Sequence, residues 1–279
     1  MSLIIDSAEK NLSSVVEEQI AMFGTKENLE FRKNLKDDKR KFKNFCDLNS
    51  VPKTYKEAVI GPESKFWKPA FKEELDAQLK NSTWSYVKKS EIRKLDKKVR
   101  IIDSCWIFTK KLLPIGKIKY KARLVIRGFQ DNNWYDFSEI FAPVAGLNEV
   151  RAILCLANAN DWDLYQMDVS TAFINSYLDK KVLMHIPEGL DLDEPFKKEN
   201  VCLVHRALYG LKTSPKRWWL RFRDVMLKMN FRSYENQACL FYWRRPKREN
   251  ETEDQVVLAI LYIDDIILTG NCQPKILET

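Results

Sequence analysis

The 279-residue sequence predicts an α+β fold, with helices and antiparallel hairpins in separate stretches of the chain. Two stretches have apolar residues at helical spacing, one beginning near Trp67 and one near Ser214. Two other stretches are typical of hairpins, because strand-like segments flank the short turns at 114–116 and 262–265. Helices and antiparallel hairpins within one chain are the elements of an α+β fold.

The first predicted element follows a stretch unlike the rest. Residues 1–50 are charged and balanced in sign, which predicts a partly disordered linker outside the folded core. From there a helix is expected to end near Asn81. Its apolar stripe consists of Trp67, Ala70, Phe71, Leu75 and Leu79, beside the acids Glu73, Glu74 and Asp76.

Strands are expected next, at 84–87, 100–111 and 118–127. The last two form a basic hairpin, with Pro114-Ile115-Gly116 as its turn. The second helix begins where Ser214 can cap it and Pro215 suits its first position. Its stripe consists of Trp218, Phe222, Val225, Met226 and Met229, and its N-terminal end is basic.

Composition sets outer limits on function. An apolar fraction of 45% with 31% charged residues is ordinary for a soluble globular protein, and no apolar run approaches the ~20 residues that span a bilayer. The six cysteines contain no CxxC pair, and there are only two histidines. A zinc site and a disulfide framework are therefore not expected, and the chain is predicted to be intracellular with reduced thiols.

Charge is distributed in blocks along the chain. Residues 80–127 have a surplus of twelve basic residues and 201–250 a surplus of nine, whereas 151–200 and 251–279 are net negative. This pattern is consistent with a protein that binds a nucleic-acid backbone through its basic blocks and a metal ion through its acidic centre. Charge blocks are also common on solvated faces, so this pattern alone is weak support.

Two adjacent acids, Asp264 and Asp265, lie between the apolar runs 256–261 and 266–268. An unpaired charge beside a core costs several kcal/mol, so a cation is expected there. A pair of Mg²⁺ ions held by carboxylates would serve, and it requires a further acid. Asp168, at the end of a predicted strand, is the candidate, although alone it would be read as a turn or helix-cap residue.

Eight short blocks occur in one order along the chain, between about Tyr55 and Gly270. They are KYKARLV at 119–125, RGF at 127–129, FSEIFAPV at 137–144, QMDV at 166–169, AF at 172–173, PEG at 187–189, LYGLK at 208–212 and YIDD at 262–265. In this order the blocks resemble the reverse transcriptase of copia-type long-terminal-repeat retrotransposons, part of a Pol polyprotein. One such block is a weak signal, but eight in order are a strong one.

The resemblance implies a polymerase made of fingers and palm, the palm being a ferredoxin-like βαββαβ sheet. The implied division is fingers at 51–160, palm with the first acidic motif at 161–176, fingers again at 177–212, and palm helix with the YIDD hairpin at 213–279. Only nine residues follow Gly270, so the palm is expected to lack its last helix and strand. Residues 1–279 alone are then expected to be loosely packed and to show no processive synthesis.

Roles for individual residues are also implied by the resemblance. Asp168 and Asp264 would bind two Mg²⁺ ions, with Mn²⁺ as an alternative, Asp265 would support them, and Val169 would offer its backbone carbonyl. Phe173, which without the motif reads as a core aromatic, would exclude a ribonucleotide 2′-hydroxyl. Nucleotide binding would fall to Ala172, Phe173, Lys121 and Arg123, and primer-template binding to Arg127, Tyr209, Lys212, Thr213, Lys216, Arg217 and Tyr262.

The implied reaction is RNA-directed DNA synthesis, in which a primer 3′-hydroxyl attacks a deoxynucleoside triphosphate and pyrophosphate leaves. The implied partners are an RNA or DNA primer-template, dNTPs, and the thumb and RNase H regions of a longer polyprotein, with no membrane. The implied location is the cytoplasm, within virus-like particles, with a nuclear phase left open.

Several positions depart from the family pattern. Thr213 stands where Gln is usual, and Lys180, Lys181 and Leu183 replace acidic and aromatic positions, which we interpret as drift in a decaying copy. The main alternative is therefore an inactive remnant or a domesticated nucleic-acid-binding module. A nucleotide cyclase on the same palm is a further alternative, but it would leave the basic hairpin without a purpose.

Overall fold

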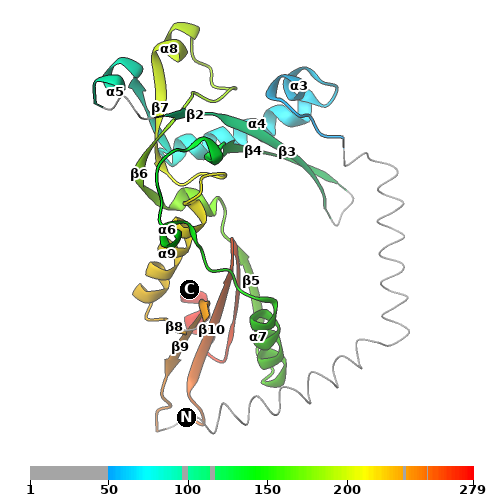
Figure 1. The fold of residues 1–279 in the computed structure, drawn as a ribbon. Helices are drawn as coiled ribbons and strands as arrows, with labels where there is room; N and C mark the ends of the chain where they lie inside the picture. The colour runs from blue at the N-terminus through cyan, green and yellow to red at the C-terminus, as the bar shows by residue number, and fades with distance from the viewer. Residues whose placement is uncertain (1–49, 96–99, 114–116, 235–236, 250) are drawn as a thin grey trace.

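The computed structural model describes residues 50–95, 100–113, 117–234, 237–249 and 251–279. The predicted linker at 1–50, apart from Ser50, and the predicted turn at 114–116 lie outside these residues. Figure 1 shows a mixed α/β architecture, as expected, in which one end of the molecule carries a long hairpin and the other a five-stranded sheet. No helix among the described residues has the length and apolar character needed to cross a bilayer.

Helices α3 (Tyr55–Ile60) and α4 (Ser64–Lys80) precede the first sheet. Strands β3 (Ser104–Leu112) and β4 (Ile118–Ile126) form the predicted antiparallel hairpin, with Phe108 paired to Ala122. Helix α4 packs on this hairpin because its apolar stripe and the inward side chains of both strands share one core. The core includes an edge-to-face contact between the Trp67 and Phe108 rings, with centroids 5.2 Å apart.

A four-stranded sheet in the order β1-β7-β6-β2 adjoins this unit. Its strands are β1 (Trp84–Lys88), β2 (Ile101–Ile102), β6 (Tyr177–Met184) and β7 (Asn200–Arg206), and the short helices α5 (Lys89–Leu95) and α8 (Glu194–Glu199) connect them at its outer end. Strand β1 begins and ends within one residue of its prediction. Strands β6 and β7 were not predicted individually.

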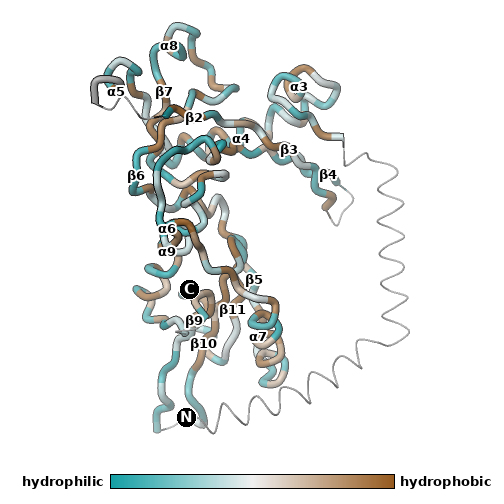
Figure 2. Tube along the Cα trace, viewed as in Figure 1, coloured by the Kyte–Doolittle hydropathy of each residue, from teal (hydrophilic) through white to brown (hydrophobic). Residues whose placement is uncertain are grey.

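A five-stranded antiparallel sheet has the order β5-β11-β10-β9-β8. Its strands are β5 (Leu164–Asp168), β8 (Arg232–Tyr234), β9 (Gln237–Arg245), β10 (Gln255–Tyr262) and β11 (Asp265–Gly270). The central strands β10 and β11 are strongly apolar, as Figure 2 shows, because both of their faces are covered. Two separate clusters on β10, one containing Val257 and Ala259 and the other Leu258 and Ile260, mark the two faces.

Helices cover both faces of this sheet. Helix α9 (Ser214–Lys228) places Trp218, Phe222 and Met226 in one cluster, together with Ile276 of α10 (Gln273–Glu278). Helix α7 (Leu147–Ala159) places Ile153 in the other. The remaining elements are the one-turn helix α6 (Phe137–Ile140) and the 3₁₀ turns η1 (Gly128–Gln130) and η2 (Ala172–Asn175).

One local prediction was wrong. Thr213, not Ser214, is the N-cap of α9, and the buried Ser214 hydroxyl instead donates to the Leu208 carbonyl at 2.5 Å. The strand predicted to end at Asp168 is present as β5, and its apolar residues Leu164 and Met167 are exposed because β5 is the edge of its sheet. The cap and this exposure both depend on tertiary contacts, which the local pattern does not show.

A close backbone contact joins the hairpin to the segment before α9. The Ile126 amide donates to the Tyr209 carbonyl at 2.8 Å. Gly210 has a φ of +92°, and a Cβ there would lie 2.0 Å from the Ile126 carbonyl oxygen. Only glycine fits this position, since both the conformation and the space exclude a side chain.

We therefore predict that Gly210→Ala lowers the free energy of unfolding by about 1–3 kcal/mol or more, the usual cost of a strained backbone. Gly146→Ala is the matched control, because its Cβ would meet only the movable Glu149 carboxylate and its φ of −76° is ordinary. It should cost less than about 1 kcal/mol, the loss expected at a helix N-cap. Urea unfolding of both variants measures the difference, and equal losses would contradict the assigned contact.

Candidate active site

The acids predicted to act together come from two neighbouring strands. Asp168 is the last residue of β5 and pairs across the sheet with Asp265, the first residue of β11. Just beyond this pair, the Val169 amide donates to the Asp264 carbonyl at 2.9 Å. Strand pairing therefore brings together acids that are almost one hundred residues apart in the sequence.

The turn that carries Asp264 is held by helix α9. Ile263 has a φ of +60°, which is unusual for a β-branched residue. Its carbonyl accepts the indole N–H of Trp218 at 2.6 Å. This bond fixes the strained turn to the buried stripe of the helix, so the place of Asp264 depends on tertiary packing as well as on the hairpin.

Asp168, Val169 and Asp264 line one cavity of about 210 Å³. The opposite wall consists of α4 and the basic strand β4, so the cavity lies where the two halves of the molecule meet. The other lining residues are Ala70, Glu73, Glu74 and Ala77 from α4, Lys119, Lys121 and Ala122 from β4, and Ser170, Thr171 and Tyr209.

Electrostatics in the cavity couple its two walls. Partial burial lowers the pKa of Lys121, and the nearby Arg123, Lys111 and Lys119 lower it further, whereas Asp168 across the cavity raises it. Burial also raises the pKa of Tyr209, against the effect of the Arg123 guanidinium, which lies 5.1 Å from the ring centroid. A ligand that brings negative charge to Lys121 would relieve the repulsion among these cations.

Glu74 is the acid on the helix side of the cavity. Burial raises its pKa, while hydrogen bonds from Gln78 and from the Leu124 amide lower it. The bond from Gln78 lies within α4, whereas the bond from the Leu124 amide attaches the helix to β4 at the cavity wall. Glu74 therefore has a structural role, and nothing in its contacts requires a ligand.

The donor set fits a hard divalent cation in part. Carboxylates and backbone carbonyls are the ligands Mg²⁺ prefers, and Asp168, Asp264 and Val169 offer both kinds within one cavity lining. Asp265 is not part of that lining, and its Oδ1 instead accepts Gln166 Nε2 at 3.4 Å. Among the described residues no three His, Cys, Asp or Glu side chains are grouped closely enough to hold a metal, so a three-acid site stays a prediction.

Phe173, the residue expected to exclude a ribonucleotide 2′-hydroxyl, is not among the residues that line the cavity. Phe173 is 8% exposed and Ala172 is buried beside it. The Phe173 ring centroid lies 4.6 Å from that of Tyr209, which does line the cavity. Tyr209 thus forms the surface that a ligand would meet, and Phe173 supports it.

The residues predicted to contact primer and template differ in burial and in the contacts that their side chains make. Thr213 is buried, Arg217 is ion-paired with Asp179, and Lys212 Nζ donates to the Asp131 carbonyl at 3.0 Å. Lys216 lies 4.5 Å from the Trp219 ring centroid, and burial lowers its pKa. Arg127, Lys212 and Tyr262 are exposed, so these side chains are the more accessible members of the set.

Three charged lining residues had no predicted site role: Glu73, Glu74 and Lys119. The two acids were read as the solvated side of an amphipathic helix. Their position one face away from the apolar stripe gave no sign that a basic hairpin would lie against them.

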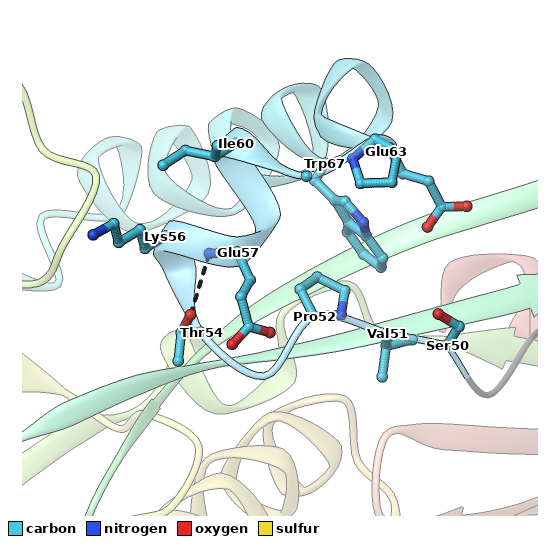
Figure 3. A pocket seen from close by; sticks show the side chains of 11 residues that line it. Ser50, Val51, Pro52, Thr54, Lys56, Glu57, Ile60, Glu63 and Trp67 are labelled. Atoms are coloured by element: carbon cyan, nitrogen blue, oxygen red, sulfur yellow. Dashed lines mark hydrogen bonds between the residues drawn. The ribbon is translucent and has the colours of Figure 1, made fainter.

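A larger cavity, of about 600 Å³, lies between the segment 50–54 and helices α3 and α4. Figure 3 shows that it is lined by Pro52, Ile60 and Trp67, with Glu57 and Glu63 at its edge. Both acids are engaged: Glu57 accepts the Lys53 amide at 2.8 Å, and Glu63 forms an ion pair with Lys110 at 2.7 Å. The candidate site is therefore the smaller cavity, because acids and cations converge there and not in the larger one.

Comparison with known proteins gives one family and several relatives. Residues 81–278 match the model of the reverse transcriptase (RNA-dependent DNA polymerase) family. The chain is 33% identical over 220 residues to the retrovirus-related Pol polyprotein from transposon TNT 1-94 of Nicotiana tabacum, covering 78% of this chain and 16% of that protein. It is 33% and 34% identical to the Pol polyproteins from transposons RE2 and RE1 of Arabidopsis thaliana, covering 80% of this chain and 14% of each.

The turn at Asp264 provides a test that needs no ligand. Trp218→Phe keeps the packing of the ring but removes the donor to the Ile263 carbonyl, so the turn should open more often. The Val169 amide, which donates to the Asp264 carbonyl, should then exchange its hydrogen for deuterium about fivefold faster, since a lost hydrogen bond is worth ~1 kcal/mol. Trp219→Phe is the matched control, because its indole donates to Ala238 instead. Equal exchange in the two variants would contradict the support from α9.

Proposed function

The chain belongs to the reverse transcriptase (RNA-dependent DNA polymerase) family, and from that premise we propose that the cavity at Asp168 and Asp264 is where template-directed nucleotidyl transfer takes place. One observation carries the proposal. The two acids of the five-stranded sheet and two lysines of the basic hairpin, Lys119 and Lys121, line the same cavity.

The two halves of the molecule correspond to a palm and fingers in this proposal. Strand β5, helix α9 and the hairpin β10–β11 occur in this order along the chain, with β6 and β7 inserted before α9 and β8 and β9 after it. The sheet order β5-β11-β10 is that of the first half of a ferredoxin-like sheet. Helices α3 and α4, the hairpin β3–β4 and the four-stranded sheet then form the fingers. Residues after Gly270 form the short helix α10, which packs on this sheet through Ile276.

The substrate would be a deoxynucleoside triphosphate with its phosphates on the basic wall. Lys119 and Lys121 attract phosphate oxygens, and binding would offset the repulsion among the cations that, after burial, lowers the pKa of Lys121. Asp168, Asp264 and the Val169 carbonyl would hold Mg²⁺, or Mn²⁺. When bound, the two ions supply charge stabilisation for the oxygens that attack and leave.

The reaction is attack by the primer 3′-hydroxyl oxygen on the α-phosphorus of the triphosphate. A new P–O bond forms, the bond to the β-phosphate oxygen breaks, and pyrophosphate leaves. The protein itself contributes mainly position, since α9 and the strand pairing fix the acids while the hairpin fixes the phosphates.

Selection of deoxyribose over ribose would depend on two contacting rings, Tyr209 in the cavity lining and Phe173 behind it. The Tyr209 ring would contact the sugar, and the buried Phe173 ring packs against Tyr209 and holds it in position. A 2′-hydroxyl on the sugar would then clash with Tyr209. The Arg123 guanidinium beside Tyr209 would bind a phosphate or the template from the same position.

The chain spans 14–16% of the length of the Pol polyproteins it matches. We therefore assign the thumb and RNase H to other parts of a polyprotein, and primer-template binding to the assembly. The cytoplasm, within virus-like particles, is the proposed location.

A non-catalytic nucleic-acid-binding module is the second candidate. The observation in its favour is that Asp265 lies outside the cavity lining, so that only two of the three acids from the five-stranded sheet share the cavity with the lysines. This candidate predicts binding of primer-template without synthesis.

We expect Asp264→Asn and Asp168→Asn each to reduce Mg²⁺-dependent primer extension by about a hundredfold or more, a loss comparable to that of one charge-stabilising group in other enzymes. Asp161→Asn is the matched control. It changes an acid just before β5, where its φ of +55° suits asparagine, and should leave extension unchanged. If the unaltered chain extends a primer and both substituted chains still do so, the assigned site is wrong. If the unaltered chain binds primer-template but does not extend it, the second candidate is favoured.

Phe173→Val is expected to weaken discrimination against ribonucleotides by lowering the support of Tyr209. The ratio of kcat/KM for dNTP to that for rNTP should fall about tenfold, the effect of a group lost from an apolar contact. Tyr242→Phe, which keeps its ring in the other sheet cluster, should leave the ratio unchanged. An unaltered ratio in Phe173→Val would exclude this role.

A further inference from the structure

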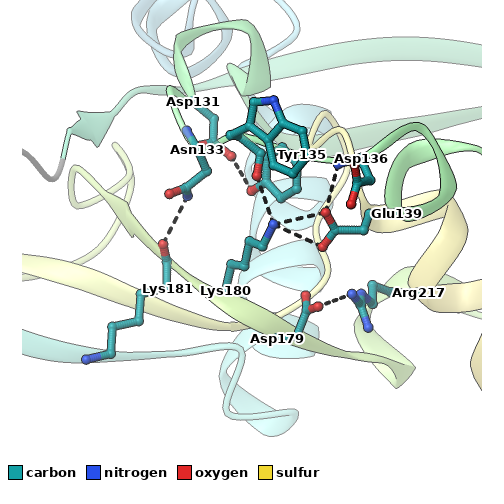
Figure 4. A network of polar contacts seen from close by, with 10 residues as sticks. Asp131, Asn133, Tyr135, Asp136, Glu139, Asp179, Lys180, Lys181 and Arg217 are labelled. Carbon is teal, nitrogen blue, oxygen red and sulfur yellow. Dashed lines mark hydrogen bonds and ion pairs between the residues drawn. The ribbon is translucent and has the colours of Figure 1, made fainter.

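Four charged side chains at the junction of the two halves of the molecule take no part in the proposed chemistry. They are Glu139 of α6, Asp179 and Lys180 of β6, and Arg217 of α9, and we call them the charge cluster. Figure 4 shows Asp179 directed toward Arg217, with which it forms an ion pair. The next residue, Lys180, is directed toward Glu139 instead. The charge cluster therefore connects the four-stranded sheet to the helix that covers the five-stranded sheet.

The ion pair of Lys180 involves both oxygens of its partner. Lys180 Nζ lies 3.0 Å from each carboxylate oxygen of Glu139, and it also donates to the Trp134 carbonyl at 2.8 Å. Hydrogen bonds from the Asp136 amide and from Lys180 lower the pKa of Glu139, and the charge of Arg217 lowers it further. Arg217 thus acts on both carboxylates of the charge cluster. Lys180, interpreted from the sequence as drift, has defined partners.

The ion pair of Arg217 engages a residue that was expected to contact primer and template. Its side chain is 20% exposed, and that of Asp179 is 42% exposed. Partial shielding from water strengthens such a pair relative to one on an open surface, which contributes little. Arg217 is not among the residues that line the cavity, so its guanidinium holds α9 to β6 rather than facing a ligand there.

Arg217 precedes Trp218, whose indole N–H donates to the Ile263 carbonyl beside Asp264. Successive residues of an α-helix point roughly 100° apart, so the first turn of α9 has two anchors in different directions. One anchor alone would let the helix turn about its axis, whereas two fix that rotation. The path from Asp179 to the turn that carries Asp264 thus runs through two neighbouring side chains.

We propose that Asp179 is a positioning residue for the candidate active site. Its ion pair with Arg217 fixes the rotation of α9, and through Trp218 this rotation sets the place of Asp264. Lys180 supports the pair by attaching the same stretch of β6 to α6. The inference rests on the proposed function for its effect on catalysis, but the positioning itself is measured without catalysis.

The test is hydrogen exchange of the full chain, followed by mass spectrometry, with the Val169 amide as the reporter because it donates to the Asp264 carbonyl. Asp179→Ala should speed its exchange about two- to fivefold, the range that a partly exposed ion pair allows. Asp179→Lys brings an ammonium beside Lys180 and Arg217, and should speed it about tenfold or more. Asp179→Glu keeps the carboxylate and should restore slow exchange.

Two matched controls separate positioning from a general loss of charge. Asp224→Ala removes an ion pair with Arg223, at 3.1 Å, that lies within α9 and does not reach β6. Lys181→Ala removes the next cation of β6, whose side chain points away from the charge cluster in Figure 4. Both variants should leave the exchange of Val169 unchanged, and thermal unfolding shows whether every variant is folded.

A double-mutant cycle tests the path. In a chain that carries Trp218→Phe, the turn has already lost its bond to α9, so adding Asp179→Ala should speed the exchange of Val169 little further. Effects of the two substitutions that simply multiply would show that Asp179 acts by another route, and would overturn the assignment.

Primer extension gives the catalytic consequence. Asp179→Ala should lower kcat about two- to fivefold and leave the KM for dNTP within about twofold, because Asp264 is displaced while the basic wall of the cavity is intact. A chain that extends no primer at all would contradict the proposed function alone, since the exchange experiment needs no activity. Unaltered exchange of Val169 in both Asp179→Ala and Asp179→Lys, or equally faster exchange in Asp224→Ala, would overturn the positioning role.

Discussion

The pairing of β5 with β11 is the constraint on which the site depends. It places Asp168 opposite Asp265, and the Val169 amide closes on the Asp264 carbonyl at 2.9 Å. Because β5 is an edge strand with little burial of its own, its position comes from this ladder rather than from packing. Register matters as much as proximity, since a slip of one residue would turn each acid to the other face.

The second constraint is the contact between the two halves of the molecule. Gly210 allows the segment before α9 to touch β4, and Trp218 of the same helix holds the turn beside Asp264. One short stretch of chain, from Tyr209 to Trp218, thus connects the basic wall of the cavity to its acidic wall. The site is built from backbone contacts and buried rings, which explains how exposed charges can be placed accurately on loops and strand ends.

Sequence reasoning predicted the elements with strong local signals and missed contacts that depend on distant partners. The stripe from Trp67 and the apolar strands around Asp264 have the spacing of the structures they form, so the helix, the hairpins and the two acids in the cavity could be predicted. The cap at Thr213 and the exposure of β5 could not, because neighbours from elsewhere in the chain decide them. The ion pair between Lys180 and Glu139 could not be predicted either, because a lysine in a sequence does not indicate its partner.

The central claim is that Asp168 and Asp264 hold a divalent cation in the cavity they share with Lys121. Replacing Mg²⁺ by Fe²⁺ and adding ascorbate and peroxide generates hydroxyl radicals at the bound ion, which cut the nearby backbone. The account predicts cleavage around Asp168 and Asp264 and in α4 near Glu73, suppressed by excess Mg²⁺. Cleavage confined to the larger cavity beside α3, or spread evenly along the chain, would contradict it.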